Sequence, residues 1–188
     1  MLLIRVFAFL ITSLSLSATA EGPRVYRNDE FGITVPVPEG TLFCVPPEDQ
    51  HDHGPVFLIG NPKPQACDDI EHNRHVVIFA SYNAAEVTKK LQGFLKWECA
   101  GMHGGTCHQA PEGLSIPAMA TKAGKVNRSD GWIDIIVVTQ AGKPAPDFDP
   151  LVPSVNYDLT LHTKPPYLEE DLRIFRAVLS TVRLAPQE

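Results

Sequence analysis

The segment from Cys44 to His108 constrains this chain more than any other feature, because it concentrates side chains that form cross-links or bind metals. It contains all four cysteines of the chain and six of its seven histidines. Two interpretations compete: disulfides that staple loops to a scaffold, and a transition-metal site built from thiolates and imidazoles. The residues are Cys44, Cys67, Cys99 and Cys107, with His51, His53, His72, His75, His103 and His108.

The first 20 residues are typical of an export signal. Arg5 precedes an apolar run from Val6 to Leu16, and the small residues Ala18–Ala20 form an A-x-A cleavage site. The apolar run is too short for a membrane span. We therefore expect residues 1–20 to be a signal peptide, and residues 21–188 to form a single domain in the bacterial periplasm.

The composition narrows the range of partners. The formal net charge is -6 at pH 7, and an acidic surface is repelled by nucleic acid and by anionic lipid head groups. We therefore expect no nucleic-acid partner and no membrane span, and a basic protein suits this surface better. The 17 prolines cluster between the periodic segments, which indicates long, stiff loops.

Hydrophobic periodicity predicts a sheet with helices packed on it. His75–Tyr82 is apolar on both alternating faces, which is typical of a central strand covered on both sides. Val155–His162 alternates, and its polar face carries Asn156, Asp158, Thr160 and His162. The other predicted elements are strands at Phe31–Val35, Thr41–Val45, Val56–Gly60, Ile116–Val126 and Trp132–Gln140, a helix capped by Asn83 and a helix after Pro166.

This order of elements predicts an α+β fold. Runs of strands interrupted by a helix and closed by a helix favour an antiparallel or mixed sheet with helices packed on it. Disulfides would then staple the long loops to that sheet.

Two segments resemble the ends of PsbP/Mog1-like domains. Tyr26–Gly40 is similar to the opening of these domains, where an aromatic-glycine strand runs into a proline-glycine turn. Asp171–Leu184 resembles their closing helix, which steps into a last short strand. The resemblance implies an antiparallel sheet sandwiched between helices, and a binding or assembly role without a shared catalytic motif.

Export makes two disulfides the simplest use of four cysteines. Three connectivities are open. We favour Cys44–Cys67 with Cys99–Cys107, because the glycine-rich segment between Cys99 and Cys107 can close locally. The first pair would tie an early strand to the loop that precedes the central one.

Metal binding is the main alternative use of this segment. The cysteines lack the tight spacing of structural zinc sites, although His51 and His53 can point to one side. A copper site from Met102, His103 and His108 is a further alternative. Because disulfides would consume the cysteines, we expect no metal and no cofactor.

The common catalytic motifs are missing from the sequence. It has no G-x-S-x-G elbow, no H-E-x-x-H, no Walker loop and no G-x-G-x-x-G. We therefore expect no catalytic residues and no enzymatic activity, and a cell-envelope hydrolase is the less specific alternative.

The long loops suit a partner-binding role. We expect a protein partner, such as a basic toxin that this protein neutralises as an immunity factor or inhibitor, and a monomer or weak dimer. The periplasmic zinc- or copper-binding protein is the alternative function. The candidate partner-binding residues are Asp49, His51, Asp52, His53, His103, Asp147, Phe148 and Asp149.

Overall fold

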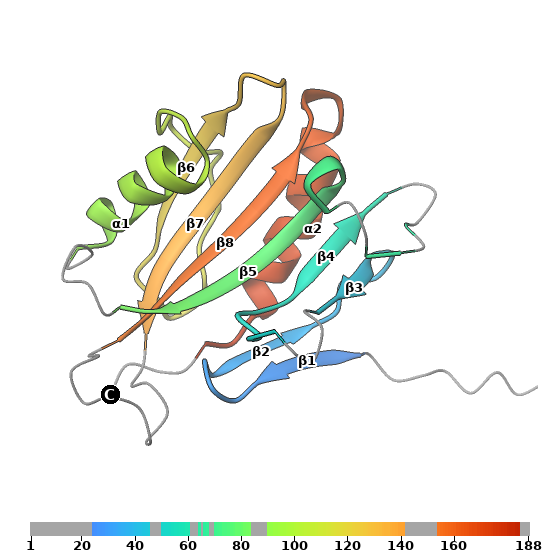
Figure 1. The fold of residues 1–188 in the computed structure, drawn as a ribbon, viewed down its shortest axis with the longest axis vertical. Helices are drawn as coiled ribbons and strands as arrows, with labels where there is room; N and C mark the ends of the chain where they lie inside the picture. The colour runs from blue at the N-terminus through green and yellow to red at the C-terminus, as the bar shows by residue number, and fades with distance from the viewer. Residues whose placement is uncertain are drawn as a thin grey trace, which may run out of the picture.

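The computed structural model describes residues 24–45, 50–60, 64, 66–67, 70–83, 90–141 and 154–184. In these residues the chain forms a two-stranded hairpin and a six-stranded antiparallel sheet. Figure 1 shows the helix α2 (Leu168–Thr181) behind the sheet and the helix α1 (Leu91–Trp97) in front of it. The predicted α+β class, with an antiparallel sheet and helices packed on it, is confirmed.

The strand that comes last in the chain lies in the middle of the sheet. The strand order is β3-β4-β5-β8-β7-β6, so β8 is hydrogen-bonded to β5 on one side and to β7 on the other. This places the alternating strand of the sequence at the centre of the molecule. The bounds are β3 (Leu42–Cys44), β4 (Val56–Ile59), β5 (Arg74–Tyr82), β6 (Lys122–Asn127), β7 (Ile133–Ala141) and β8 (Val155–Thr163).

The hairpin of β1 (Val25–Asn28) and β2 (Ile33–Pro36) lies beside the sheet. Its second strand ends at Pro36, as expected for a residue that cannot donate a ladder hydrogen bond. Thr34 exchanges two backbone hydrogen bonds with Arg183, of 2.9 and 2.8 Å. The hairpin is thereby joined to the end of the chain.

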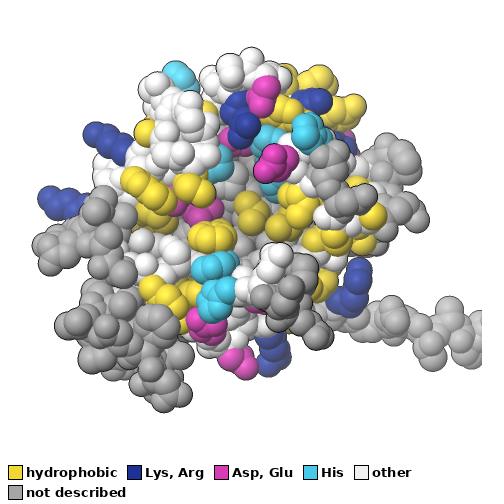
Figure 2. All heavy atoms as spheres, viewed as in Figure 1, with side chains coloured by type: hydrophobic (Ala, Val, Ile, Leu, Met, Phe, Trp, Pro, Cys, Tyr) yellow, Lys and Arg dark blue, Asp and Glu magenta, His cyan; other side chains and the backbone are white. Residues whose placement is uncertain are grey.

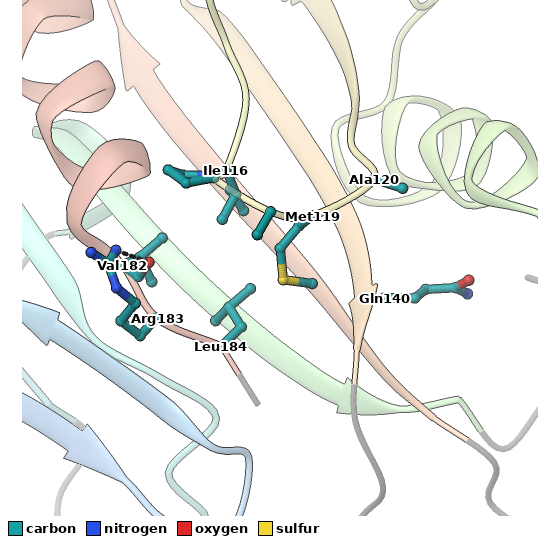
Figure 3. A pocket seen from close by; sticks show the side chains of 9 residues that line it. Ile116, Met119, Ala120, Gln140, Val182, Arg183 and Leu184 are labelled. Carbon is teal, nitrogen blue, oxygen red and sulfur yellow. Dashed lines mark hydrogen bonds between the residues drawn. The ribbon is translucent and has the colours of Figure 1, made fainter. Parts of the chain in front are cut away.

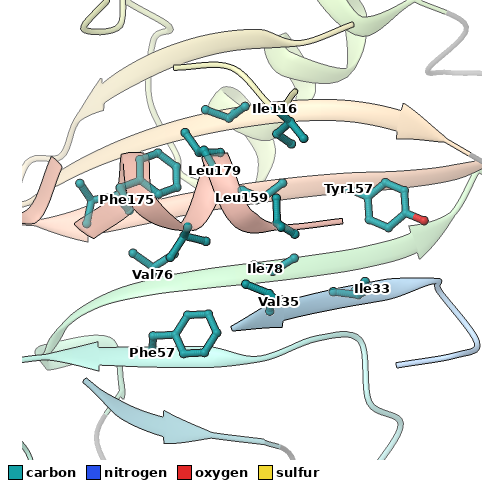
Figure 4. Packing of buried hydrophobic residues seen from close by; sticks show 14 of the residues in the cluster. Ile33, Val35, Phe57, Val76, Ile78, Ile116, Tyr157, Leu159, Phe175 and Leu179 are labelled. Carbon is teal, nitrogen blue, oxygen red and sulfur yellow. The ribbon is translucent and has the colours of Figure 1, made fainter. Parts of the chain in front are cut away.

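One face of the sheet packs on the amphipathic helix α2 (Leu168–Thr181). Phe175 is fully buried at the centre of this layer, and Leu179 is 1% exposed. Figure 4 shows both side chains lying over Val76 and Leu159 of the sheet. The short helix η4 (Pro165–Tyr167) leads into α2, so the predicted start of the final helix after the proline pair is confirmed.

The other face is covered differently. The helix α1 (Leu91–Trp97) continues into a π-helical turn, η3 (Glu98–Met102), and packs on β6 and β7. Phe94 and Leu95 contact Ile136 and Val138 there. Lys90, immediately before α1, is extended, so no single helix runs from Asn83 through Leu95. Residues 84–89, which follow the predicted cap, lie outside the described residues.

Both predicted disulfides are present. Cys44 pairs with Cys67 and Cys99 pairs with Cys107, with Cα–Cα distances of 5.7 and 5.4 Å. The second bond packs against Gly124 of β6, where an added Cβ would come within 2.9 Å of the Cys107 sulfur. The predicted stapling of loops is therefore confirmed. All helices in the described ranges fall short of what a membrane crossing requires in length and apolar character.

Candidate functional site

The sheet face that α2 does not cover carries rows of polar side chains. On this face Asp158 of β8 lies between Phe79 of β5 and Val138 of β7, and His162 lies between His75 and Asp134. The sequence predicted that one face of β8 is polar. It did not predict that this face is buried, yet each of its four polar residues is less than a tenth exposed. Figure 2 shows histidine, acidic and apolar side chains gathered across this face. We call it the polar face, and it comprises His75, Val77, Phe79, Asp134, Asn156, Asp158, Thr160 and His162.

A cavity of about 350 Å³ opens at one end of the polar face. Three histidines from three separate parts of the chain line it, and Asp134 and Arg128 contribute charge. The sequence offers no hint of this convergence, because the strand order and not the sequence spacing brings the histidines together. We call this space the imidazole cavity; its lining residues are Glu71, His75, Val77, Met102, His103, Arg128, Asp134, Thr160 and His162.

Asp134 organises the cavity. Its two carboxylate oxygens accept hydrogen bonds from Nδ1 of His162 at 2.5 Å and from Nδ1 of His103 at 2.8 Å. Arg128 approaches it to 3.6 Å. Burial raises the pKa of Asp134, but the two imidazole donors outweigh that effect and hold the pKa well below its usual range. Asp134 is therefore an ionised, fully engaged carboxylate.

His75 is a neutral imidazole at neutral pH. Burial lowers its pKa to about 4, against the opposing effect of its hydrogen bond to Asn73. Because a carbonyl can only accept, Nδ1 of His75 donates to the Asn73 oxygen, at 2.8 Å. Its Nε2 therefore carries a lone pair.

His162 is held rigidly, yet one of its nitrogens has no partner. Its ring stacks on Trp132 with centroids 4.2 Å apart, and lies 5.0 Å from the His75 ring. Its Nε2 is buried without a hydrogen bond. A buried polar atom left unpaired costs about 1–3 kcal/mol, so this atom calls for a ligand or a functional role.

Two carboxyl groups lie near each other between α1 and the sheet. Glu98 is 4% exposed and Asp158 is 7% exposed. Burial raises the pKa of Glu98 to about 7, although His103 opposes this. Burial, followed by the charge of Glu98, raises the pKa of Asp158 well above its usual range. Both carboxyl groups therefore keep their protons to higher pH than exposed carboxyl groups do.

An aromatic cluster borders the polar face at its other end. Phe79 is 38% exposed although it lies in a central strand, so the prediction that both faces of His75–Tyr82 are covered is wrong at this position. Its ring stacks on His53 at 4.7 Å, and His53 meets His51 at 4.6 Å. We call Phe79, His51 and His53 the aromatic rim.

Backbone geometry fixes the aromatic rim in place. Nδ1 of His53 lies 2.8 Å from the backbone oxygen of Ala80, to which it donates. Gly54 has φ +141, and an added Cβ would lie 2.1 Å from the Ile78 oxygen, so only glycine lets the chain pass this close to β5. Asp52 accepts a hydrogen bond from the Tyr26 hydroxyl at 2.8 Å, which ties the rim to the hairpin.

The predicted partner-binding residues divide into three groups. His51, His53 and His103 all lie against the polar face, at its two ends. Asp52 instead has a structural role, because it accepts bonds from Tyr26 and from the Gly54 amide. The remaining candidates, Asp49, Asp147, Phe148 and Asp149, lie outside the described residues.

Sequence reasoning missed several residues of the site, although two of them carry a detectable signal. Asp134 interrupts the apolar strand WIDIIVV, and His162 ends the polar face of an alternating strand. A buried acid within an apolar run suggests a paired role. The other missed residues are His75, Phe79, Glu98, Arg128 and Asp158.

A second pocket lies on the α2 side. It measures about 290 Å³ and is largely apolar. Figure 3 shows Met119 and Leu184 pointing toward each other across it. It lacks the buried charged groups that mark the imidazole cavity.

Among the residues that the structure describes, no three His, Cys, Asp or Glu side chains are grouped to hold a metal ion. A preformed site with three such ligands is therefore absent from those residues. His108, from the copper alternative, pairs with Lys125 at the sheet edge and does not line the imidazole cavity.

Comparisons with known proteins bear on the fold. No protein-family model matches this chain, and no curated protein matches it in sequence. The solution structure of cyanobacterial PsbP (CyanoP) from Synechocystis sp. PCC 6803 is similar, with a TM-score of 0.47 and 13% identity, over 90% of this chain and 97% of that one. LpqN, involved in cell envelope biogenesis of Mycobacterium tuberculosis, is similar with a TM-score of 0.46 and 12% identity, over 89% of this chain and 88% of that one.

The first of these structures is a PsbP protein, and PsbP/Mog1-like domains are the ones that the two terminal segments of this sequence resemble. The similarity concerns the arrangement alone, so function is argued from the site. The two disulfides are compatible with an exported protein.

Proposed function

We propose that this protein is an exported binding module, without catalytic activity, that uses the polar face to bind a basic protein. The observation that carries the proposal is an exposed aromatic side chain beside buried acids. Phe79 lies directly across from Asp158 in the register of β5 and β8, and 38% of its surface is exposed. Aromatic side chains beside desolvated polar groups dominate the energy of many protein interfaces.

Charge selects the partner. The chain carries a formal charge of -6. Asp158, the cross-strand neighbour of Phe79, and Glu98, whose charge acts on Asp158, both have raised pKa values. A lysine or arginine of the partner would lie over the ring of Phe79 and attract these carboxyl groups into their ionised form. We therefore expect the affinity for the partner to rise as the pH increases through about 7.

The proposal is tested with tagged mature protein as bait in extracts of its own cells. Wild type, Phe79→Ala and Trp97→Ala are compared by quantitative mass spectrometry, followed by dissociation constants for the recovered protein. Trp97 is a matched control, because it is an aromatic residue that is 48% exposed on α1. We expect a basic protein that Phe79→Ala loses, with a dissociation constant raised at least tenfold, about 1.4 kcal/mol, and that Trp97→Ala keeps.

The contrary result is equally clear. If no protein depends on Phe79, and the purified chain hydrolyses cell-wall or lipid substrates, the molecule is an enzyme and the proposal is wrong.

Export and immunity are the finer parts of the proposal. We propose that residues 1–20 are a cleaved signal peptide, so N-terminal sequencing of the periplasmic protein should begin at Glu21. An immunity role predicts that the recovered partner is a toxin whose activity falls in stoichiometric complex with this protein. An unprocessed N-terminus would contradict export, and a partner without toxicity would contradict the immunity role.

A further inference from the structure

The three imidazoles of the imidazole cavity share one feature that the binding proposal does not use. Nδ1 of His75 donates to the Asn73 oxygen, and Nδ1 of His103 and of His162 donate to Asp134. In its neutral form each ring therefore holds its proton on Nδ1 and presents a lone pair on Nε2. This is how backbone carbonyls and carboxylates orient the histidines of metal sites.

Two of these rings are close enough to share one ion. His75 and His162 are direct neighbours across β5 and β8, and their centroids lie 5.0 Å apart. Two imidazoles that bind one ion with bonds of about 2.0–2.1 Å bring their rings to about this separation. Nε2 of His162 is buried without a partner, in a residue that is only 6% exposed, and an ion would satisfy it.

The remaining donors indicate which ion fits. Zinc sites in proteins use at least three ligands from histidine, cysteine and acidic residues, and no such trio is grouped in the described residues. Met102, which carries a thioether and is 62% exposed, also lines the cavity. Imidazole together with thioether sulfur favours copper(I).

We propose that His75 and His162 bind one copper(I) ion through their Nε2 atoms in the imidazole cavity, with the Met102 thioether as the third ligand. Asp134 and the Asn73 carbonyl act behind these ligands and hold both rings in the binding tautomer. The ion is bound without any electron transfer. The site uses different residues from those that carry the partner-binding proposal.

The test is an anaerobic competition between the mature full-length protein and the chromophoric copper(I) chelator bicinchoninate. We expect wild type to withdraw one copper(I) per chain. Asp134→Asn should weaken binding roughly 10–100-fold, as loss of second-shell support does, and His75→Gln and His162→Gln should each weaken it further. Met102→Leu should weaken copper(I) binding as well.

Two controls keep the result decisive. His108→Gln removes a histidine outside the cavity and should bind copper(I) like wild type. His162→Gln removes a buried ring stacked on Trp132, so this variant is at risk of misfolding. Two measurements do not depend on it: copper(I) binding by His75→Gln, and the shift of the His75 Nε2 resonance when copper(I) is added to wild type. Phe79→Ala should retain copper(I) binding, which separates this inference from the partner-binding proposal.

The inference is overturned if wild type withdraws no copper(I). It is also overturned if His75→Gln binds the ion as tightly as wild type, or if the His75 Nε2 resonance does not move.

Discussion

The two faces of the central sheet follow opposite principles. Under α2, the side chains of Val76, Leu159 and Phe175 interlock and are fully buried. On the polar face, the same strands bury Asp134, Asp158 and His162, with one ring nitrogen left unpaired. The first face stabilises the fold. The buried polar groups of the second face lower the stability, and we interpret this loss as a consequence of a binding function.

The same strands build both faces, so the difference lies in the alternation of side chains. β8 places Leu159 under α2 and Asp158 on the polar face, one residue apart. Because successive side chains point to opposite faces, a rigid apolar layer can position the polar layer directly. Function on the polar face thus depends on packing on the other face.

The largest expected effect contrasts one phenylalanine from each face. Phe175→Ala creates a cavity in the packed core and should lower the free energy of unfolding by about 3–5 kcal/mol. Phe79→Ala removes a partly exposed ring and should cost at most about 1 kcal/mol. Urea titration of both variants at one pH measures the contrast. Equal losses would mean that the polar face is a second core.

The next effect comes from Glu98, through the pH dependence of stability. Its pKa is about 7 in the folded chain, above the ordinary value of 4.5, so between these values the folded state binds more protons than the unfolded state. Stability therefore falls as pH rises from about 4.5 to 7. Glu98→Gln should abolish this fall and gain on the order of 3 kcal/mol relative to wild type at pH 8.

Unfolding titrations at pH 4.5 and pH 8 measure this gain. Glu112→Gln, at an exposed position, is the matched control and should leave the pH dependence unchanged. A Glu98→Gln variant with the pH dependence of wild type would show that Glu98 is not a buried proton carrier.

His75 should give a pH dependence of stability of similar size and opposite slope. Its pKa is about 4 in the folded chain, below the ordinary value of 6.5, so the unfolded state binds more protons between these two pH values. Stability is therefore lost as pH falls from about 6.5 to 4. His75→Gln should remove about 3 kcal/mol of this acid sensitivity. Unfolding titrations at pH 4 and pH 7 measure it, and His108→Gln should behave as wild type does.

The two titrating groups sharpen the comparison when they are measured together. Their pH windows overlap, and the slopes of stability against pH that they produce have opposite signs. When one group is replaced, the free energy of unfolding should therefore follow the pH dependence that the other group produces. If both variants change the slope in the same direction, the assignment of raised and lowered pKa values is wrong.

Local patterns predict the elements of this fold well. The apolar runs at Val56–Gly60 and Trp132–Gln140 and the alternation of Val155–His162 correspond to β4, β7 and β8. The predicted cysteine pairs are also present. Errors occur where tertiary contacts decide, as at Ile116, which is buried in a loop before β6, and at the extended Lys90.

The site was harder to predict, because strand order creates it. His75, His103 and His162 come from distant parts of the sequence and meet only because β8 inserts between β5 and β7. Asp52 shows a related difficulty: the sequence places an acid in a loop, but it does not reveal that the carboxylate accepts hydrogen bonds from Tyr26 and the Gly54 amide. Single-sequence patterns do not reveal which loop polar groups are already paired.

The central claim is that the polar face meets a partner at Phe79. Site-specific photocrosslinking in intact cells tests it directly, with a benzophenone amino acid placed at Phe79 or, as control, at Trp97. We predict one discrete adduct from position 79 and none of that mass from position 97. No adduct at position 79, or the same adducts from both positions, would contradict the account.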